Sequence, residues 1–238
     1  MNVLITGGAS GLGLALTKTI AAAGHKVAFT YHSSQQQAGV LETEFAGCKG
    51  YACDFKDAQS VQNLIDQLSD IQPDALINNA LASLQAVQFQ KWNVSDLGTS
   101  FAENVVPTLA VTQGCIEQFR KKKSGRIITI LSSYLVNKPP TGYAEYVANK
   151  SYLLSMSKSW ASENAKFNIV SNCVSPSTMK TGLTADVDER LMETMALENP
   201  LRRLVEPQEV AEFVCSLLTA SQQINATHIV MNGGQNVI

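Results

Sequence analysis

The stretch NVLITGGASGLG, residues 2–13, is a short β-rich run that breaks directly into a glycine turn. Behind the turn, Leu14, Leu16, Ile20 and Ala21 recur at helical spacing up to Gly24. A strand, a glycine turn and a helix in this order let backbone N–H groups approach a pyrophosphate at the helix N-terminus, where the helix dipole favours anions. The stretch therefore predicts a dinucleotide site at the start of an α/β fold.

The segment after the second predicted strand, residues 26–31, bears on the choice of cofactor. An NAD site usually places an Asp or Glu about 20 residues beyond the glycines, against the ribose 2′-OH. The first acidic residue after this turn is Glu42, and His32, Ser33 and Ser34 stand where the acid is expected. These side chains can donate to a 2′-phosphate. The segment favours NADP(H); NAD(H) and a polar loop indifferent to the cofactor are the alternatives.

Strand and helix patterns alternate through the rest of the chain. The predicted strands are 2–6, 26–31, 50–55, 74–80, 125–131, 167–174 and 228–231, with helical periods between them. This alternation predicts a single α/β domain, a doubly wound parallel sheet of Rossmann type, with ligands outside the carboxyl ends of the strands. The long helical pattern of residues 95–120 contains Pro107, which predicts a kink. Residues 182–199 are polar, acidic and contain Met, which predicts a mobile substrate lid.

Composition excludes several classes of function. A formal net charge of −2 and a pI near 5.9 leave no electrostatic footprint for nucleic acid or an anionic membrane. The five cysteines form no C-x-x-C and share no metal-ligand spacing with the three histidines, so we expect no metal site. With no leader-like N-terminus and no long apolar run, we expect a cytoplasmic protein.

Tyr146 and Lys150 are four residues apart in a segment that runs into helix-permissive sequence, so on a helix they share one face. A cation about 4 Å from a phenol favours phenolate by roughly 4 kcal/mol, enough to bring its pKa from about 10 towards 7. The pair is thus a candidate proton donor for reducing a carbonyl, or acceptor for oxidising an alcohol. The simpler alternative is a surface tyrosine beside a solvated lysine.

In addition to these features, the chain carries Asp54 after the third strand, Asn78-Asn79-Ala80 after the fourth, Asn104 in the long helix and paired serines after the fifth. With these motifs in order, the chain resembles the short-chain dehydrogenase/reductase superfamily over nearly its whole length. The segment NPLRRLVEPQEVA, residues 199–211, is similar to the 3-oxoacyl-[acyl-carrier-protein] reductase branch.

The resemblance implies hydride transfer between NADP(H) and a carbonyl or alcohol, such as a 3-oxoacyl thioester or a similar ketone. Tyr146 would be the acid/base, Lys150 would lower its pKa and hold the ribose, Ser132 would bind the substrate oxygen, and Asn104 would hold a relay water. Asp54 would accept from the adenine amino group. The implied cofactor-binding set is Gly7, Ser10, Gly11, Leu12, Gly13, His32, Ser33, Asp54, Phe55, Asn79, Ala80, Tyr146, Lys150, Pro176, Thr178 and Thr181. A homo-oligomer, a dimer or tetramer, is also implied.

Three departures from the family pattern stand out. Leu81 replaces the usual glycine after Asn-Asn-Ala, Ser177 replaces the glycine after Pro176, and Ala226 replaces a C-terminal glycine. None removes a catalytic group, but Leu81 adds bulk beside the nicotinamide side of the site. An NAD-dependent alcohol dehydrogenase is the alternative among enzymes. A dinucleotide-binding redox sensor without turnover is the alternative outside them.

The substrate oxygen has two candidate partners, Ser132 and Ser133. The family's usual spacing back from Tyr146 points to Ser133, but the loop at Pro139 absorbs insertions easily. Side-chain direction alternates strictly along a strand, and counting forward from Gly125 points to Ser132. We therefore predict that Ser132 faces the site, while Ser133 faces away and bonds local backbone.

Overall fold

The first strand, β1 (Asn2–Ile5), is buried on both faces. Val3 and Ile5 belong to one hydrophobic cluster and Leu4 to another, because successive side chains of a strand point to opposite faces of the sheet. A strand with two apolar faces needs cover on both sides. The computed structural model, which describes residues 1–184 and 187–236, provides that cover with helices.

The strands are β1, β2 (Lys26–Tyr31), β3 (Cys48–Ala52), β4 (Ala75–Asn78), β5 (Gly125–Ile130), β6 (Ile169–Pro176) and β7 (His228–Met231). The α-helices are α1 (Gly11–Ala22), α2 (Gln35–Glu44), α3 (Ala58–Asp66), α4 (Leu68–Ile71), α5 (Leu97–Asn104), α6 (Val106–Lys122), α7 (Ala144–Asn164), α8 (Glu189–Glu198) and α9 (Pro207–Leu217). Short 3₁₀ turns are η1 (Phe89–Lys91), η2 (Val94–Asp96), η3 (Ser133–Leu135), η4 (Ala165–Phe167) and η5 (Gly182–Thr184).

All seven strands pair in parallel in the order β3-β2-β1-β4-β5-β6-β7. The chain first builds outward from β1 to β3, then returns to place β4 on the other side of β1. Strand order therefore reverses between β1 and β4, and the loops that follow these two strands diverge to opposite faces. In open α/β sheets such a crevice is where ligands bind. The predicted Rossmann-type parallel sheet is confirmed.

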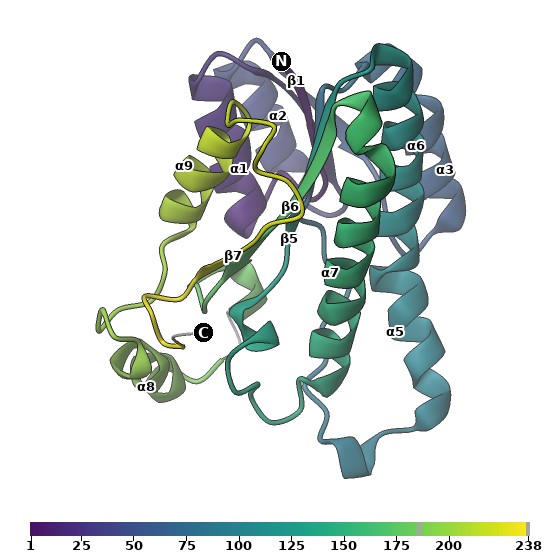
Figure 1. The fold of residues 1–238 in the computed structure, drawn as a ribbon. Coiled ribbons are helices and arrows are strands. Elements are labelled where there is room, and N and C mark those ends of the chain that lie inside the picture. The colour runs from purple at the N-terminus through teal and green to yellow at the C-terminus, as the bar shows by residue number, and fades with distance from the viewer. Residues whose placement is uncertain (185–186, 237–238) are drawn as a thin grey trace.

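Two helical layers cover the sheet (Figure 1). Leu16 of α1 and Val210 of α9 pack with the cluster on one face, and α2 lies on the same side. Val111 of α6 and Trp160 of α7 belong to the cluster on the other face, together with Leu64 of α3. Among the described residues, no helix is both long and apolar enough to cross a membrane.

Each predicted strand is present, with ends displaced by a few residues. The third strand begins at Cys48 rather than residue 50, because Cys48 already pairs with Val27. At the predicted kink the helix is interrupted at one residue, Val105: α5 ends at Asn104 and α6 begins at Val106, with Pro107 in its first turn. Proline is tolerated there because a first-turn N–H has no partner within its helix.

The predicted lid region, residues 182–199, contains η5 and α8. Asp188 caps α8 by accepting from the backbone N–H groups of Arg190 and Leu191. Residues 185–186 lie outside the described residues. In Figure 1, α8 lies at the same edge of the sheet as the carboxyl ends of the strands, and its mobility stays a prediction.

We predict that Gly13→Ala destabilises the fold, because a Cβ at this position would overlap the carbonyl oxygen of Gly7. Relief requires a shift of backbone, so the free energy of unfolding should fall by about 1–3 kcal/mol. Gly39→Ala is the matched control: its Cβ meets nothing within 4 Å, and α2 should gain roughly 0.4–1 kcal/mol. Urea denaturation measures both. Equal stability of the two variants would contradict the close approach.

Candidate active site

The carboxyl ends of the strands open on one large cavity of about 1370 Å³. This exceeds the roughly 300–1,000 Å³ of a site for one small ligand. The residues that the sequence predicted to bind the cofactor all line it: Gly7, Ser10, Gly11, Leu12, Gly13, His32, Ser33, Asp54, Phe55, Asn79, Ala80, Tyr146, Lys150, Pro176, Thr178 and Thr181. Ser132 lines it too. The fold thus brings the predicted set together, and its contacts with a cofactor stay predictions.

The glycine turn forms a cradle at the N-terminus of α1. Gly7 has φ 68°, which favours glycine, and its N–H donates to Thr30 Oγ1 at 2.8 Å. A side chain at Gly13 would fill the space between α1 and the turn. The N-cap residue Ser10 makes no side-chain hydrogen bond to the helix, so its hydroxyl does not compete for the first-turn N–H groups. The cradle fits a pyrophosphate.

Asn79 ties the loop after β4 to the glycine turn after β1, across the crevice where the strand order reverses (the switch point of the sheet). Its Nδ2 donates to the carbonyl oxygens of Thr6 at 3.0 Å and Gly7 at 3.1 Å. In return, Thr6 Oγ1 accepts from the backbone N–H groups of Asn79 at 2.9 Å and Ala80 at 3.1 Å. These bonds hold the two walls of the crevice in register.

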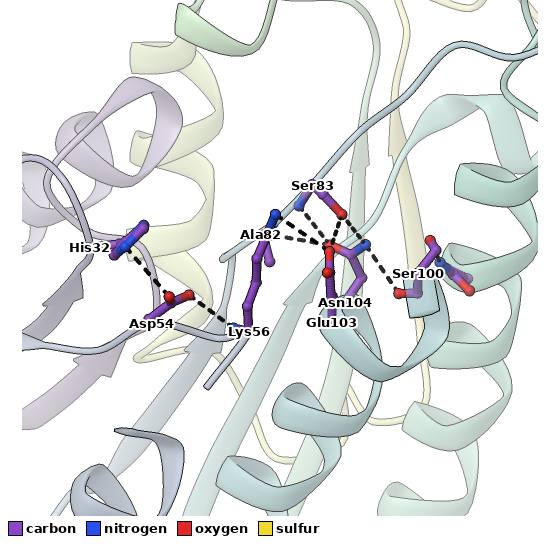
Figure 2. A network of polar contacts seen from close by, with 9 residues as sticks. His32, Asp54, Lys56, Ala82, Ser83, Ser100, Glu103 and Asn104 are labelled. Carbon is purple, nitrogen blue, oxygen red and sulfur yellow. Dashed lines mark hydrogen bonds and ion pairs between the residues drawn. The ribbon is translucent and has the colours of Figure 1, made fainter. Parts of the chain in front are cut away.

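Asn104 holds the same loop from the other side (Figure 2). Its Oδ1 accepts from the N–H groups of Ala82 at 2.9 Å and Ser83 at 3.2 Å, and its Nδ2 donates to Ser83 Oγ and the Ser100 carbonyl. The side chain is only 5% exposed. It lines a second cavity of about 230 Å³ rather than the large one. Its amide is thus engaged in binding this loop, and its predicted hold on a relay water stays a prediction.

Tyr146 and Lys150 project from the first turns of α7 and line both cavities. Lys150 Nζ donates to the Ile130 carbonyl at 2.8 Å and lies 5.8 Å from the centre of the Tyr146 ring. Desolvation raises the pKa of Tyr146 to about 12, and the neighbouring Ser132 hydroxyl opposes that rise. Desolvation lowers the pKa of Lys150 to about 8.

The expected lowering of the Tyr146 pKa is therefore wrong for this structure. Burial disfavours phenolate and ammonium alike, and the ammonium of Lys150 is turned to the end of β5. The phenol is held in its neutral form, which can donate a proton but not accept one. A phenol with a raised pKa is a weaker acid than a free tyrosine, so the role of Tyr146 in proton transfer stays a prediction.

The paired serines after β5 differ in their surroundings. Ser132 lines the large cavity and accepts from the backbone N–H of Tyr134 at 3.3 Å, capping η3. Ser133 is 1% exposed, and its hydroxyl has no hydrogen-bond partner among the described residues. The expectation that Ser133 bonds local backbone is wrong, because Ser132 takes the N–H that this turn offers.

Sequence reasoning missed Tyr134 and gave Tyr143 only the part of a substitute for Tyr146. The Tyr134 hydroxyl lies 2.9 Å from Thr178 Oγ1, which joins the loop after β5 to that after β6. Its ring centre is 6.0 Å from that of Tyr143, which is 6.0 Å from that of Tyr146, and all three rings line the large cavity. An aromatic residue two places after a strand-end serine was the available signal.

The far end of the cavity holds His32 and Asp54, whose Nε2 and Oδ2 atoms lie 3.5 Å apart. Asp54 also accepts from the backbone N–H of Lys56 at 2.9 Å. A histidine side chain paired with a carboxylate is less free to bind a phosphate. Ser33 and Ser34 line the same end, and Ser34 makes no side-chain cap bond to α2.

Comparisons with known proteins agree with this fold. A family model described as enoyl-(acyl carrier protein) reductase matches residues 7–236. The 3-oxoacyl-[acyl-carrier-protein] reductase MabA of Mycobacterium tuberculosis is 29% identical, over 99% of this chain and 93% of that protein. The acetoacetyl-CoA reductase of Rhizobium meliloti is 32% identical, over 98% of this chain and 97% of that protein. The solved structure of a double mutant of a Serratia marcescens short-chain dehydrogenase/reductase has a TM-score of 0.87 at 26% identity, covering 99% and 97% of the two chains.

The chain belongs to the short-chain dehydrogenase/reductase superfamily. It is an oxidoreductase whose chemistry is hydride transfer between a nicotinamide dinucleotide and a ketone or its alcohol. The cavity at the carboxyl ends of the strands is where this short-chain dehydrogenase/reductase gathers its predicted cofactor residues and Tyr146, its predicted acid/base.

Substitution of the two serines should separate their roles. Ser132→Ala removes a hydroxyl that lies beside Tyr146, and we expect kcat to fall about a hundredfold. Ser133→Ala removes a buried hydroxyl without a partner, so activity should stay within a few fold and the free energy of unfolding should stay constant or rise by about 1 kcal/mol. Steady-state kinetics and urea unfolding measure these effects. A larger loss of kcat in Ser133→Ala would reverse the assignment.

Lys150 should make stability depend on pH. Its pKa falls from an ordinary 10.5 to about 8, so below pH 8 the folded protein bears the full cost of a buried ammonium, roughly 3 kcal/mol. That cost disappears between pH 8 and 10.5, as the folded state releases its proton first. Relative to Lys150→Met, wild-type stability should therefore rise over this range. Urea unfolding of both proteins at pH 7 and pH 10 tests the sign, and a constant difference would refute it.

Proposed function

We propose that this chain reduces the ketone of a 3-oxoacyl thioester, or of a similar 3-oxo compound, with NADPH as the reductant. The observation that carries the proposal is a neutral Tyr146 phenol that interacts with Ser132 inside the cavity formed by the glycine turn and the strand ends. An acid beside a hydroxyl donor is what a carbonyl oxygen needs as it becomes an alcohol.

Each side chain has one task in this reaction. Ser132 donates a hydrogen bond to the ketone oxygen, which orients the carbonyl and stabilises the negative charge that develops there. A bound nicotinamide supplies the hydride to the carbonyl carbon. Tyr146 gives its proton to the oxygen, which completes the alcohol, and regains one from solvent. Lys150 holds the ribose and carries positive charge beside the phenolate that forms, which favours proton release.

The preference for NADPH rests on the end of β2 and the start of α2. Ser33 and Ser34 line the cavity directly before α2, whose first turn contains no acidic residue. The N-terminus of this helix favours an anion such as a 2′-phosphate. The contact of His32 with Asp54 weakens the contribution that we expected from His32, so the two serines and the helix carry the preference.

The lining of the large cavity includes apolar side chains that suit an acyl chain. Leu183, Leu191, Met192 and Met195 line it from η5 and α8. Two similar proteins are named for reduction of 3-oxoacyl groups carried on a protein or on CoA. A cavity that is lined by both apolar side chains and the predicted catalytic residues suits a ketone attached to a hydrocarbon chain.

We extend the proposal to assembly and location. Val106 and Tyr152 are exposed apolar residues on α6 and α7, and Tyr152 stacks edge-to-face on Phe101 of α5. This surface suits burial against a second copy, in a dimer or tetramer that sedimentation would reveal. All five cysteines are free, which suits the reducing environment of the cytoplasm.

A turnover screen tests the proposal. Wild type is assayed with NADPH and with NADH against acetoacetyl-CoA and a panel of simple ketones. We expect acetoacetyl-CoA to be reduced, with kcat/KM about tenfold or more higher with NADPH, since a charge-assisted hydrogen bond to the 2′-phosphate is worth that much. Tyr146→Phe should lose about a hundredfold or more in kcat while binding NADPH normally.

Three outcomes would change the proposal. A comparable kcat/KM with NADH would replace NADPH by NADH. Activity confined to the simple ketones would remove the thioester. If Tyr146→Phe keeps more than a few per cent of activity, Tyr143, whose ring centre lies 6.0 Å away, becomes the proton donor to test.

A further inference from the structure

A chain of polar contacts joins the loop after β3 to the loop after β4 (Figure 2). It begins with His32 and Asp54 at the adenine end and passes through the backbone N–H of Lys56. Lys56 Nζ lies 3.5 Å from Glu103 Oε2, and the same carboxylate oxygen accepts from Ser83 Oγ at 2.8 Å. The Glu103 carboxylate therefore joins Ser83 to Lys56 in the loop after β3.

The network continues from Ser83 towards the catalytic helix. Ser83 Oγ accepts from Asn104 Nδ2, which also donates to the Ser100 carbonyl. Ser100 Oγ accepts from Asn149 Nδ2 at 3.1 Å, and Asn149 directly precedes Lys150 on α7. The contacts thus cross from the loop after β3 to that after β4, on the two sides of the switch point, and reach α7.

Lys56 and Glu103, the ion pair at the centre of this network, line neither cavity. Lys56 instead directly follows Asp54 and Phe55, which line the large cavity at its adenine end. Glu103 binds Ser83, and the neighbouring Leu81 lines both cavities next to Tyr146 and Lys150. Any influence of the pair on a ligand must therefore pass through these two loops.

We propose that Glu103 is a positioning residue: paired with Lys56, it couples occupation of the adenine end of the cavity to the order of the loop at residues 81–84. The inference rests on the proposed placement of a dinucleotide in the large cavity. Binding at the adenine end fixes Asp54 and Phe55, hence the backbone of Lys56. Glu103 passes this restraint to Ser83 and so to the wall beside Tyr146.

Folding stability alone does not explain this pair. The side chains of Lys56 and Glu103 are 47% and 23% exposed, and ion pairs of this kind contribute little to the free energy of unfolding. Loss of the pair should therefore leave the melting temperature nearly unchanged. Its loss should instead change how strongly ligand binding at the adenine end alters the order of residues 81–84.

Amide hydrogen exchange by NMR tests the coupling without any turnover. Adenosine 2′,5′-bisphosphate and adenosine 5′-monophosphate are the probes, because neither carries a nicotinamide that could touch residues 81–84 directly. The readout is exchange at the N–H groups of Ala82 and Ser83, both of which donate to Asn104 Oδ1. In wild type, a saturating probe should slow their exchange about fivefold, the lower end of typical couplings.

Two substitutions break the pair from its two sides. Glu103→Gln keeps an oxygen that can accept from Ser83 but loses the charge that faces Lys56, and Lys56→Met keeps the backbone N–H that binds Asp54. Each should lose most of the slowing, and the double variant should lose no more than either single one. Glu44→Gln is the matched control, since Lys18 and Glu44 form a similarly exposed pair at 3.0 Å, away from both cavities. It should behave as wild type.

Several results would overturn the inference: no slowing in wild type with either probe, full slowing in Glu103→Gln, or losses that add in the double variant. The cofactor assignment is judged separately by the relative affinities of the two probes. Tighter binding of the bisphosphate supports NADPH even if the loop does not respond. A responding loop supports the role of Glu103 even if both probes bind equally.

Discussion

The first turn of α1 can approach the Gly7 carbonyl only because position 13 has no side chain. This approach brings the N-terminus of the helix to the end of β1, and the rest of the site is arranged around it. Asn79 then bonds the carbonyl oxygens of Thr6 and Gly7, which places the loop after β4 against the same turn. One absent Cβ thus determines how closely α1 approaches the turn to which the loop after β4 is bonded.

Much of this arrangement could be predicted from sequence, because buried parallel strands are runs of apolar residues that end in polar residues or glycines. Asp54, Asn79 and Ser132 stand at predicted strand ends, the family resemblance implied roles for them, and the fold gathers them at one cavity. Strand ends were less certain, since pairing rather than hydropathy decides them. The partnerless hydroxyl of Ser133 and the place of Tyr134 against the loop after β6 depend on the local path of η3, which no periodicity records.

The pKa of Tyr146 shows where sequence reasoning failed. Four-residue spacing correctly placed a phenol and an ammonium on one face of α7, and Coulomb attraction alone would lower the pKa of the phenol. The spacing carries no information on burial, which desolvates both groups and shifts both pKa values towards the neutral forms. Burial is a property of what packs around the pair, here the end of β5 and the loop that Asn104 holds.

Leu81 forms part of the wall between the two cavities, with Ala80 and Leu84 beside it. A shorter side chain there would merge the smaller space with the larger one while leaving the hydrogen bonds of Asn104 to the Ala82 and Ser83 backbone in place. The residue that borders both spaces is therefore distinct from the residues predicted to carry out the chemistry. A substitution at Leu81 can alter the room beside Tyr146 and Lys150 without removing any side chain of the predicted catalytic set.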